Sequence, residues 1–148
     1  MHATSCSSEP PARQRIVIVD DHALMRHGLT VLIDNEPDLV VCAAVDTPRE
    51  GLEAIAISPP DLVIADLSLA RGDGLAMVKD IRAGHQYLPI LVLTMHDSPV
   101  WVRRAFQAGA SGYVSKQEMS ETLLVAIRCV LDGERYLSAR MSLKLDAN

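Results

Sequence analysis

Five short, nearly continuous aliphatic runs, each followed by an amphipathic stretch, constrain the fold of this chain more than any other feature. The runs lie at residues 16–20, 39–45, 61–66, 89–94 and 112–115. The stretches that follow them repeat their apolar residues at helical spacing, which predicts five alternations of strand and helix. Because the runs lack the apolar–polar alternation of a half-exposed strand, we expect helices to cover both faces of one parallel sheet.

Several of the predicted helices have recognisable ends. The helices are expected at residues 23–34, 48–57, 75–82, 99–108 and 120–132. Thr47-Pro48-Arg49-Glu50 is a capping box with proline at the first helical position. Gly133 is a typical stop for the last helix. His22 directly precedes the first helix, and we expect it to cap or border that helix rather than to bind a metal.

The composition favours one α/β domain over residues 15–133. Residues 1–14, rich in Ser and Pro, are expected to form a disordered leader. Residues 134–148 are too short to fold alone and are expected to form a C-terminal tail or the start of a linker. Hydrophobic residues make up 49% of the chain, enough to bury a core without disulfides. The formal net charge of −5 argues against a chain that wraps nucleic acid by itself.

Cysteine spacing and hydropathy bear on the compartment. The three cysteines, Cys6, Cys42 and Cys129, have no metal-ligand or disulfide-framework spacing, which fits a reducing environment. No apolar run approaches the length of about 18 residues that a membrane span needs. The N-terminus also lacks the apolar segment of a secretory signal. The sequence therefore predicts a cytoplasmic protein without a membrane partner.

Polar side chains follow four of the five predicted strands. Asp20 and Asp21 follow the first strand, Asp66 ends the third, Thr94 ends the fourth, and Lys116 follows the fifth. Each residue alone could be an ordinary turn or cap residue. In an open parallel sheet, however, ligands bind beyond the carboxyl ends of the strands. The combination therefore predicts one functional site at that edge.

The residue types at this edge suit phosphoryl chemistry on a carboxylate. A hard dication such as Mg²⁺ binds through one or two carboxylates, which Asp20, Asp21 and Asp66 supply. Asp66 can also attack phosphorus as a nucleophile and form an acyl phosphate. Lys116 provides an ammonium group and Thr94 a hydroxyl for the phosphate oxygens. Since three clustered carboxylates repel one another, we expect a metal there, Mg²⁺ first and Mn²⁺ as an alternative.

These residues, in this order, resemble the receiver domains of two-component response regulators over about residues 15–133. The resemblance implies a flavodoxin-like (CheY-like) α/β fold, with a five-stranded parallel sheet of order 2-1-3-4-5 and helices on both faces. It also implies that a histidine kinase transfers a phosphoryl group to Asp66. By this resemblance the chain is a signalling switch and not an enzyme, because it catalyses only its own phosphorylation and dephosphorylation.

Four segments are similar to the NarL/FixJ (LuxR-type) branch of that family: VDDHALMRHGL, LTMHD, AFQAGASGYVSK and GERYLS. The branch implies control of transcription through a C-terminal DNA-binding domain that these 148 residues do not contain. It also implies a weak homodimer through the first and last helices. A stand-alone receiver that acts by protein–protein contact is the alternative. A Mg²⁺-dependent phosphatase with an Asp nucleophile fits less well, since Asp66-Leu67-Ser68 lacks a second acid.

The resemblance also implies finer roles for individual residues. Thr94 and Tyr113 are the expected switch pair, in which the hydroxyl moves toward the phosphate and the ring rotates inward. Ser68 is expected to offer its backbone carbonyl to the metal. Ser68 and His96 are expected to border the phosphate and to influence its hydrolysis. Ala70 stands where many relatives have proline, which predicts a more mobile loop.

Overall fold

A computed structural model describes residues 12–69 and 73–146 of the chain. Most of the expected leader, residues 1–11, lies outside this part, and so does Ala70 with its predicted loop mobility. In the described part, no helix combines the length and the apolar character that crossing a membrane would require.

The strands form one parallel sheet in the order β2-β1-β3-β4-β5-β6. The predicted order of the first five strands is confirmed, but the predicted total of five is wrong because β6 pairs with β5 over two residues. The strands are β1 (Gln14–Val19), β2 (Leu39–Val45), β3 (Leu62–Ala65), β4 (Ile90–Thr94), β5 (Gly112–Ser115) and β6 (Tyr136–Leu137).

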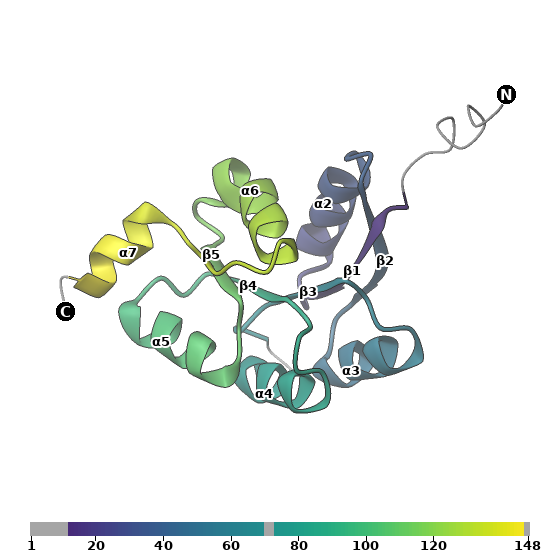
Figure 1. Ribbon diagram of the computed structural model, residues 1–148, viewed down its shortest axis with the longest axis horizontal. Coiled ribbons are helices and arrows are strands. Elements are labelled where there is room, and N and C mark those ends of the chain that lie inside the picture. Colours follow the sequence, from purple (N-terminus) through teal and green to yellow (C-terminus); the bar gives the residue numbers. More distant parts are fainter. Residues whose placement is uncertain (1–11, 70–72, 147–148) are drawn as a thin grey trace, which may run out of the picture.

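Helices cover both faces of the sheet, as the continuous aliphatic runs predicted. In Figure 1, α2 and α6 lie on one face, α3, α4 and α5 lie on the other, and α7 lies beside α5. The bounds are α2 (Ala23–Asp34), α3 (Pro48–Ile57), α4 (Gly74–Gly84), α5 (Pro99–Ala108), α6 (Met119–Leu131) and α7 (Ala139–Asp146).

Each buried strand contributes to two separate cores. In β1, Ile16 and Ile18 pack with Leu29 of α2 and Ile127 of α6. The alternate residues of the same strand, such as Val17, belong to the core beneath α3, α4 and α5. Successive side chains of a strand point to opposite faces, so a run buried on both faces must be apolar at every position. The sheet is thereby held between two apolar layers.

Local signals explain where two of the helices begin. The Thr47 hydroxyl accepts a hydrogen bond from the Glu50 N–H at 3.2 Å, and Pro48 is the first residue of α3, as predicted. The Asp73 carboxylate caps α4 by accepting from the N–H groups of Leu75 and Ala76. Such caps satisfy N–H groups that have no partner within the helix.

The C-terminal segment is folded rather than an extended tail. Gly133, at φ 87°, follows α6, and the chain returns to place Tyr136 and Leu137 beside Gly112 and Tyr113. Met141 of α7 is fully buried in the core that contains α5. A two-residue strand has no detectable periodicity, so the sequence did not predict this addition.

Gly74 packs directly against the backbone that follows Asp66. A Cβ at position 74 would lie 2.6 Å from the Asp66 carbonyl oxygen and 2.6 Å from the Cα of Leu67. We therefore expect Gly74→Ala to lower the free energy of unfolding by about 1–3 kcal/mol, measured by urea denaturation, because the backbone must shift.

Gly84→Ala on the same helix is the matched control. No atom lies within 4 Å of a Cβ at position 84, so its stability should stay within about 0.5 kcal/mol of the parent or rise slightly. Equal losses in both variants would contradict the steric explanation.

Candidate functional site

The backbone hydrogen bonds of the sheet bring the polar residues to one edge. The Asp66 N–H donates to the Val19 carbonyl at 3.0 Å, which places Asp66 beside the end of β1. In the same way, the Lys116 N–H donates to the Thr94 carbonyl at 2.8 Å. The residues that follow β1, β3, β4 and β5 are therefore neighbours, as the sequence predicted.

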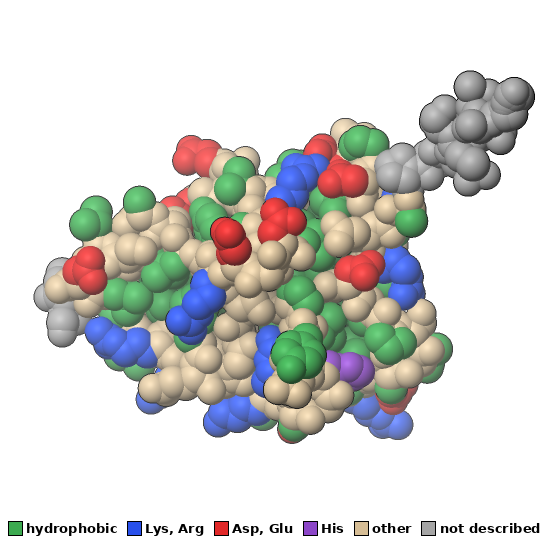
Figure 2. All heavy atoms as spheres, in the orientation of Figure 1, with side chains coloured by type: hydrophobic (Ala, Val, Ile, Leu, Met, Phe, Trp, Pro, Cys, Tyr) green, Lys and Arg blue, Asp and Glu red, His purple; other side chains and the backbone are tan. Residues whose placement is uncertain are grey.

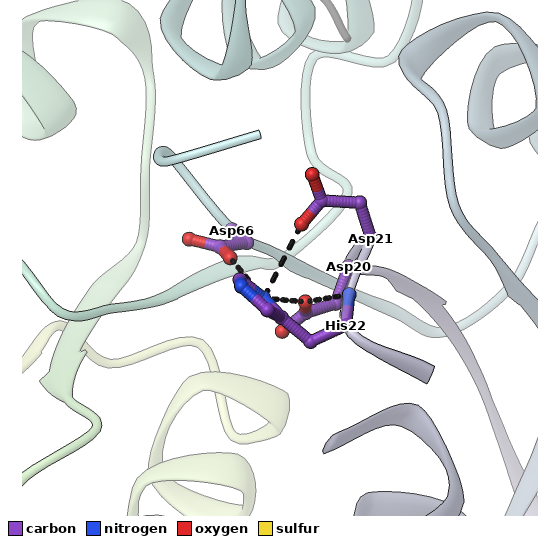
Figure 3. Close-up of side chains that lie close together, drawn as sticks. All are labelled: Asp20, Asp21, His22 and Asp66. Carbon is purple, nitrogen blue, oxygen red and sulfur yellow. Dashed lines mark hydrogen bonds and ion pairs between the residues drawn. The ribbon is translucent and has the colours of Figure 1, made fainter. Parts of the chain in front are cut away.

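Three carboxylates form an acidic cluster, which consists of Asp20, Asp21 and Asp66. Figure 3 shows Asp20 and Asp21 approaching from the segment after β1 and Asp66 from the segment after β3. One oxygen of each, with a ring nitrogen of His22, lies within 4.8 Å of the others. Asp20 and Asp66 are 2% and 1% exposed, so their mutual repulsion is little screened by water.

Lys116 is the buried cation of this cluster. Its Nζ donates to Asp20 Oδ2 at 2.8 Å and to Asp66 Oδ2 at 3.0 Å, and its side chain is 3% exposed. Burial lowers the pKa of Lys116, but the hydrogen bonds to Asp20 and Asp66 outweigh it, so that the pKa is raised overall. The ammonium group therefore stays charged and joins the ends of β1, β3 and β5.

His22 reaches further into the site than the sequence indicated. It occupies the N-cap position of α2, but its side chain makes no capping hydrogen bond. Instead, its Nδ1 lies 2.9 Å from Asp20 Oδ1 and 3.2 Å from Asp21 Oδ1 (Figure 3). In the sequence, only the position of His22 beside two aspartates pointed to this contact. The rotamer of its ring depends on neighbours that meet at the edge of the folded sheet.

Ser68 holds the opposite side of the Asp66 carboxylate, with Thr94 beside it. The N–H and hydroxyl of Ser68 donate to Asp66 Oδ1 at 2.9 and 2.7 Å. The Ser68 hydroxyl lies 3.5 Å from the Thr94 hydroxyl, which is fully buried. Both oxygens of Asp66 are therefore engaged, one by Ser68 and the other by Lys116.

Tyr113 lies inward and is tied to the loop between β4 and α5. Its ring is fully buried, and its hydroxyl donates to the backbone carbonyl of His96. Burial, with the nearby charges of Asp97 and Asp66, raises the pKa of Tyr113, so the phenol remains a protonated donor. The His96 N–H in turn approaches the Thr94 hydroxyl at 3.4 Å. The two predicted switch residues are thus joined through His96.

Comparison with known proteins agrees with this geometry. The family model of the response regulator receiver domain matches residues 16–128. The chain belongs to the response regulator receiver family. A crystal structure of a LuxR-family two-component response regulator from Aurantimonas sp. SI85-9A1 is 33% identical, with a TM-score of 0.87, and the match covers 92% of this chain and 97% of that one. This likeness supports the NarL/FixJ branch within the family.

Two curated relatives of this receiver are longer proteins. The oxygen regulatory protein NreC of Staphylococcus haemolyticus is 33% identical over 88% of this chain and 61% of its own length. The transcriptional regulatory protein UhpA of Salmonella typhimurium is 33% identical over 89% of this chain and 66% of its own length. The receiver therefore spans about three fifths to two thirds of these relatives.

The acidic cluster of the receiver fits a hard divalent cation. Its three carboxylates face one buried ammonium group, which leaves a net negative charge at a site lined by oxygen atoms. One carboxylate oxygen of Asp21 is buried within this cluster. Mg²⁺ prefers such oxygen ligands and binds them as one or two carboxylates with water. Carboxylate oxygens are therefore the main donors of the site, with the His22 ring nitrogen beside them.

His96 carries an aromatic contact that the sequence did not predict. Its ring stacks on Trp101 of α5, with centroids 4.3 Å apart and planes 8° from parallel. The guanidinium of Arg104 lies over the Trp101 ring, 5.6 Å from the ring centroid. The stack links the loop that follows β4 to the first turns of α5, so a movement of this loop would also displace the start of the helix.

The inward position of Tyr113 can be tested by removing its hydroxyl. Tyr113→Phe leaves the His96 carbonyl without its donor, so we expect a loss of about 1 kcal/mol in the free energy of unfolding, measured by urea denaturation. Tyr87→Phe, at an 86% exposed side chain, is the matched control and should leave stability unchanged. A Tyr113→Phe variant as stable as the parent would argue against this bond.

Proposed function

We propose that this receiver accepts a phosphoryl group on Asp66 from a histidine kinase and changes conformation in response. One observation carries the proposal. The Asp66 carboxylate is 1% exposed and lies at the edge of the sheet, with Lys116 on one oxygen and Ser68 on the other. A nucleophile held from both sides is positioned for in-line attack, and position and charge neutralisation are what phosphoryl transfer needs.

The transfer forms one bond and breaks another. A carboxylate oxygen of Asp66 attacks the phosphorus, and the bond from phosphorus to the nitrogen of the kinase histidine breaks. The electron pair of that bond remains on the imidazole nitrogen. The Lys116 ammonium then balances the charge on the phosphoryl oxygens, and the Thr94 hydroxyl donates to one of them. The same residues assist hydrolysis of the acyl phosphate, in which a water oxygen bonds to the phosphorus, the bond from phosphorus to the Asp66 oxygen breaks, and the carboxylate leaves. The chain therefore acts on itself alone.

Asp20, Asp21 and Asp66 are the residues that would hold Mg²⁺, with Mn²⁺ as a substitute, and the Ser68 backbone carbonyl would be a further ligand. When bound, the metal neutralises the charge that gathers on the phosphoryl oxygens. The proposal is supported by three carboxylates that each place one oxygen within 4.8 Å of the others, two of them bonded to Lys116. A phosphatase of unrelated esters is disfavoured, because Asp66-Leu67-Ser68 has no second acid to protonate a leaving group.

Thr94 and Tyr113 are proposed to transmit the signal. On phosphorylation, Thr94 turns its hydroxyl to the phosphate, and the loop that holds His96 follows. Since the Tyr113 hydroxyl bonds to the His96 carbonyl, the ring and the loop move together. The change at Asp66 is thereby carried to β5 and α5, which is a shift between two states of one surface.

The output is proposed to be transcription through a DNA-binding domain outside these 148 residues. UhpA, described as a transcriptional regulatory protein, supports this reading over a receiver that works alone. The receiver itself is ill suited to DNA, with a net charge of −5. Figure 2 shows acidic and basic side chains interspersed on the drawn face. Cys42 and Cys129 are free thiols, which fits a reducing compartment, so we place the chain in the cytoplasm.

A weak homodimer through α2 and α6 is proposed as the partner arrangement. These helices lie on the same face of the sheet (Figure 1). Leu24 and Val31 of α2 are 85% and 54% exposed, and Val125 of α6 is 62% exposed. Such side chains can be covered by a second copy of the same face in a two-fold arrangement.

Phosphorylation at Asp66 is tested with acetyl phosphate and Mg²⁺, followed by the intact mass. We expect a gain of one phosphoryl group, about 80 Da, which is lost in Asp66→Ala and falls sharply when Mg²⁺ is removed with a chelator. Asp80→Ala, at an exposed aspartate of α4, is the control and should keep the adduct. An adduct that persists in Asp66→Ala would refute the assignment.

Ser68 and His96 are expected to set the lifetime of the acyl phosphate, because both border Asp66 or Thr94. Exchanging both residues for alanine should change the half-life severalfold, measured as phosphate release from protein phosphorylated beforehand. Thr122→Ala, which removes a hydroxyl that donates to the Glu118 carbonyl at the start of α6, is the control. A half-life that stays the same in the double variant would remove both residues from this role.

A further inference from the structure

Residues 136–146, here called the cover segment, lie over the edge of the sheet beside Tyr113. The N–H of Tyr136 donates to the Ser111 carbonyl at 3.1 Å, and Leu137 pairs with Tyr113 in the parallel register. Met141 is fully buried in the core that α5 lines. Figure 1 shows α7 alongside α5 at this end of the molecule. The cover segment therefore closes an edge that β5 would otherwise expose.

Two basic side chains of α7 hold the cover segment to the loop between β4 and α5. Arg140 and Lys144 bond to one oxygen of Asp97, at 3.2 and 3.1 Å. Arg140 also donates to the side-chain oxygen of Gln117 at 3.3 Å, on the loop after β5. The hydrogen bond from Lys144 is the main cause that lowers the pKa of Asp97, so its carboxylate is charged at neutral pH.

The loop that carries Asp97 is the same loop that meets the phosphorylation site. Thr94 ends β4, His96 accepts from the buried Tyr113 hydroxyl, and Asp97 follows directly. A movement of Thr94 toward a phosphate would also displace His96 and Asp97. The anchor of α7 is thus three residues from the group that would sense the phosphate, and no other element lies between them.

We propose that the cover segment is an autoinhibitory contact that phosphorylation of Asp66 loosens, through displacement of Asp97. This inference rests on the proposed function. Opening uncovers the edge of β5 and the surface of α5 beneath α7. The contact also stabilises α7 itself, because an isolated helix of eight residues is not stable in water.

The hold of Asp97 is weak enough to be switched. Asp97, Arg140 and Lys144 have side chains that are 34%, 43% and 36% exposed. Ion pairs at such exposure contribute little each, and salt screens them. The cover segment is also held by the buried Met141, by two strand pairings, by the 2.7 Å hydrogen bond from Ser138 to Glu118, and by the packing of Leu137 and Leu145. Local opening of such a segment is far easier than global unfolding.

The test measures amide hydrogen exchange by NMR on the whole chain at two amides, those of Tyr136 and Ser142. The Ser142 N–H donates to the Ser138 carbonyl at the start of α7. The probe is Mg²⁺ with beryllofluoride, which mimics an acyl phosphate. We expect exchange at both amides to rise about fivefold when the probe binds. Exchange that stays the same or slows while the probe is bound would overturn the proposal.

The double variant Arg140→Gln, Lys144→Gln tests the anchor without any phosphate. It should raise exchange at Tyr136 and Ser142 by about fivefold with no probe present. Arg49→Gln, which removes an exposed ion pair with Glu53 on α3, is the matched control and should leave both amides unchanged. A double variant that exchanges like the control would also overturn the proposal.

Linkage gives a second readout. If the probe favours the open cover segment, a mutation that favours the open segment in turn favours the probe, so the double variant should bind beryllofluoride more tightly than the parent. Shifts in the Ser68 and Asp66 amide signals report binding at the site itself. Absence of these shifts would refute the proposed function, whereas shifts without faster exchange would refute only the proposed opening of the cover segment.

Discussion

The two hydrogen bonds of the Lys116 ammonium, to Asp20 and to Asp66, are the interaction on which the site depends. Three carboxylates meet at the end of two neighbouring strands, and a single buried cation holds two of them together. Without it, the nearly unexposed Asp20 and Asp66 would repel each other in a region that water hardly screens. The sheet order makes this arrangement necessary, since β1 and β3 lie side by side and β5 reaches the same edge.

The loop after β4 connects the surroundings of Asp66 to the surface formed by α5 and α7. Thr94 faces Ser68, which holds Asp66, while His96 holds Tyr113 through its carbonyl and Trp101 through its ring. Asp97 then fastens α7. One short segment thus contacts Ser68 beside Asp66, a buried ring, the start of α5 and the C-terminal helix. Because these contacts share one short loop, the proposed shift of Thr94 would reach each of them.

The acidic cluster, Lys116 and Thr94 could be predicted from the sequence because each directly follows or ends an aliphatic run. In a parallel sheet, that position alone decides where a side chain goes. The His22 contact with Asp20 and the stacking of His96 on Trp101 could not be predicted. They depend on side-chain rotamers, which are chosen by neighbours that are distant in the sequence.

The sequence by itself determined the two-sided sheet, because burial on both faces demands aliphatic residues at every strand position. The order of the first five strands came from the family resemblance, and the positions of Asp20, Asp21, Asp66, Thr94 and Lys116 came from the ends of the strands. Only the tertiary structure decided the fate of residues 134–146. Their strand has two residues and their helix has eight, too short to carry a period or to be stable alone. Their order comes from the open edge of β5, the core beside α5 and the carboxylate of Asp97, and these meet only when the chain is folded.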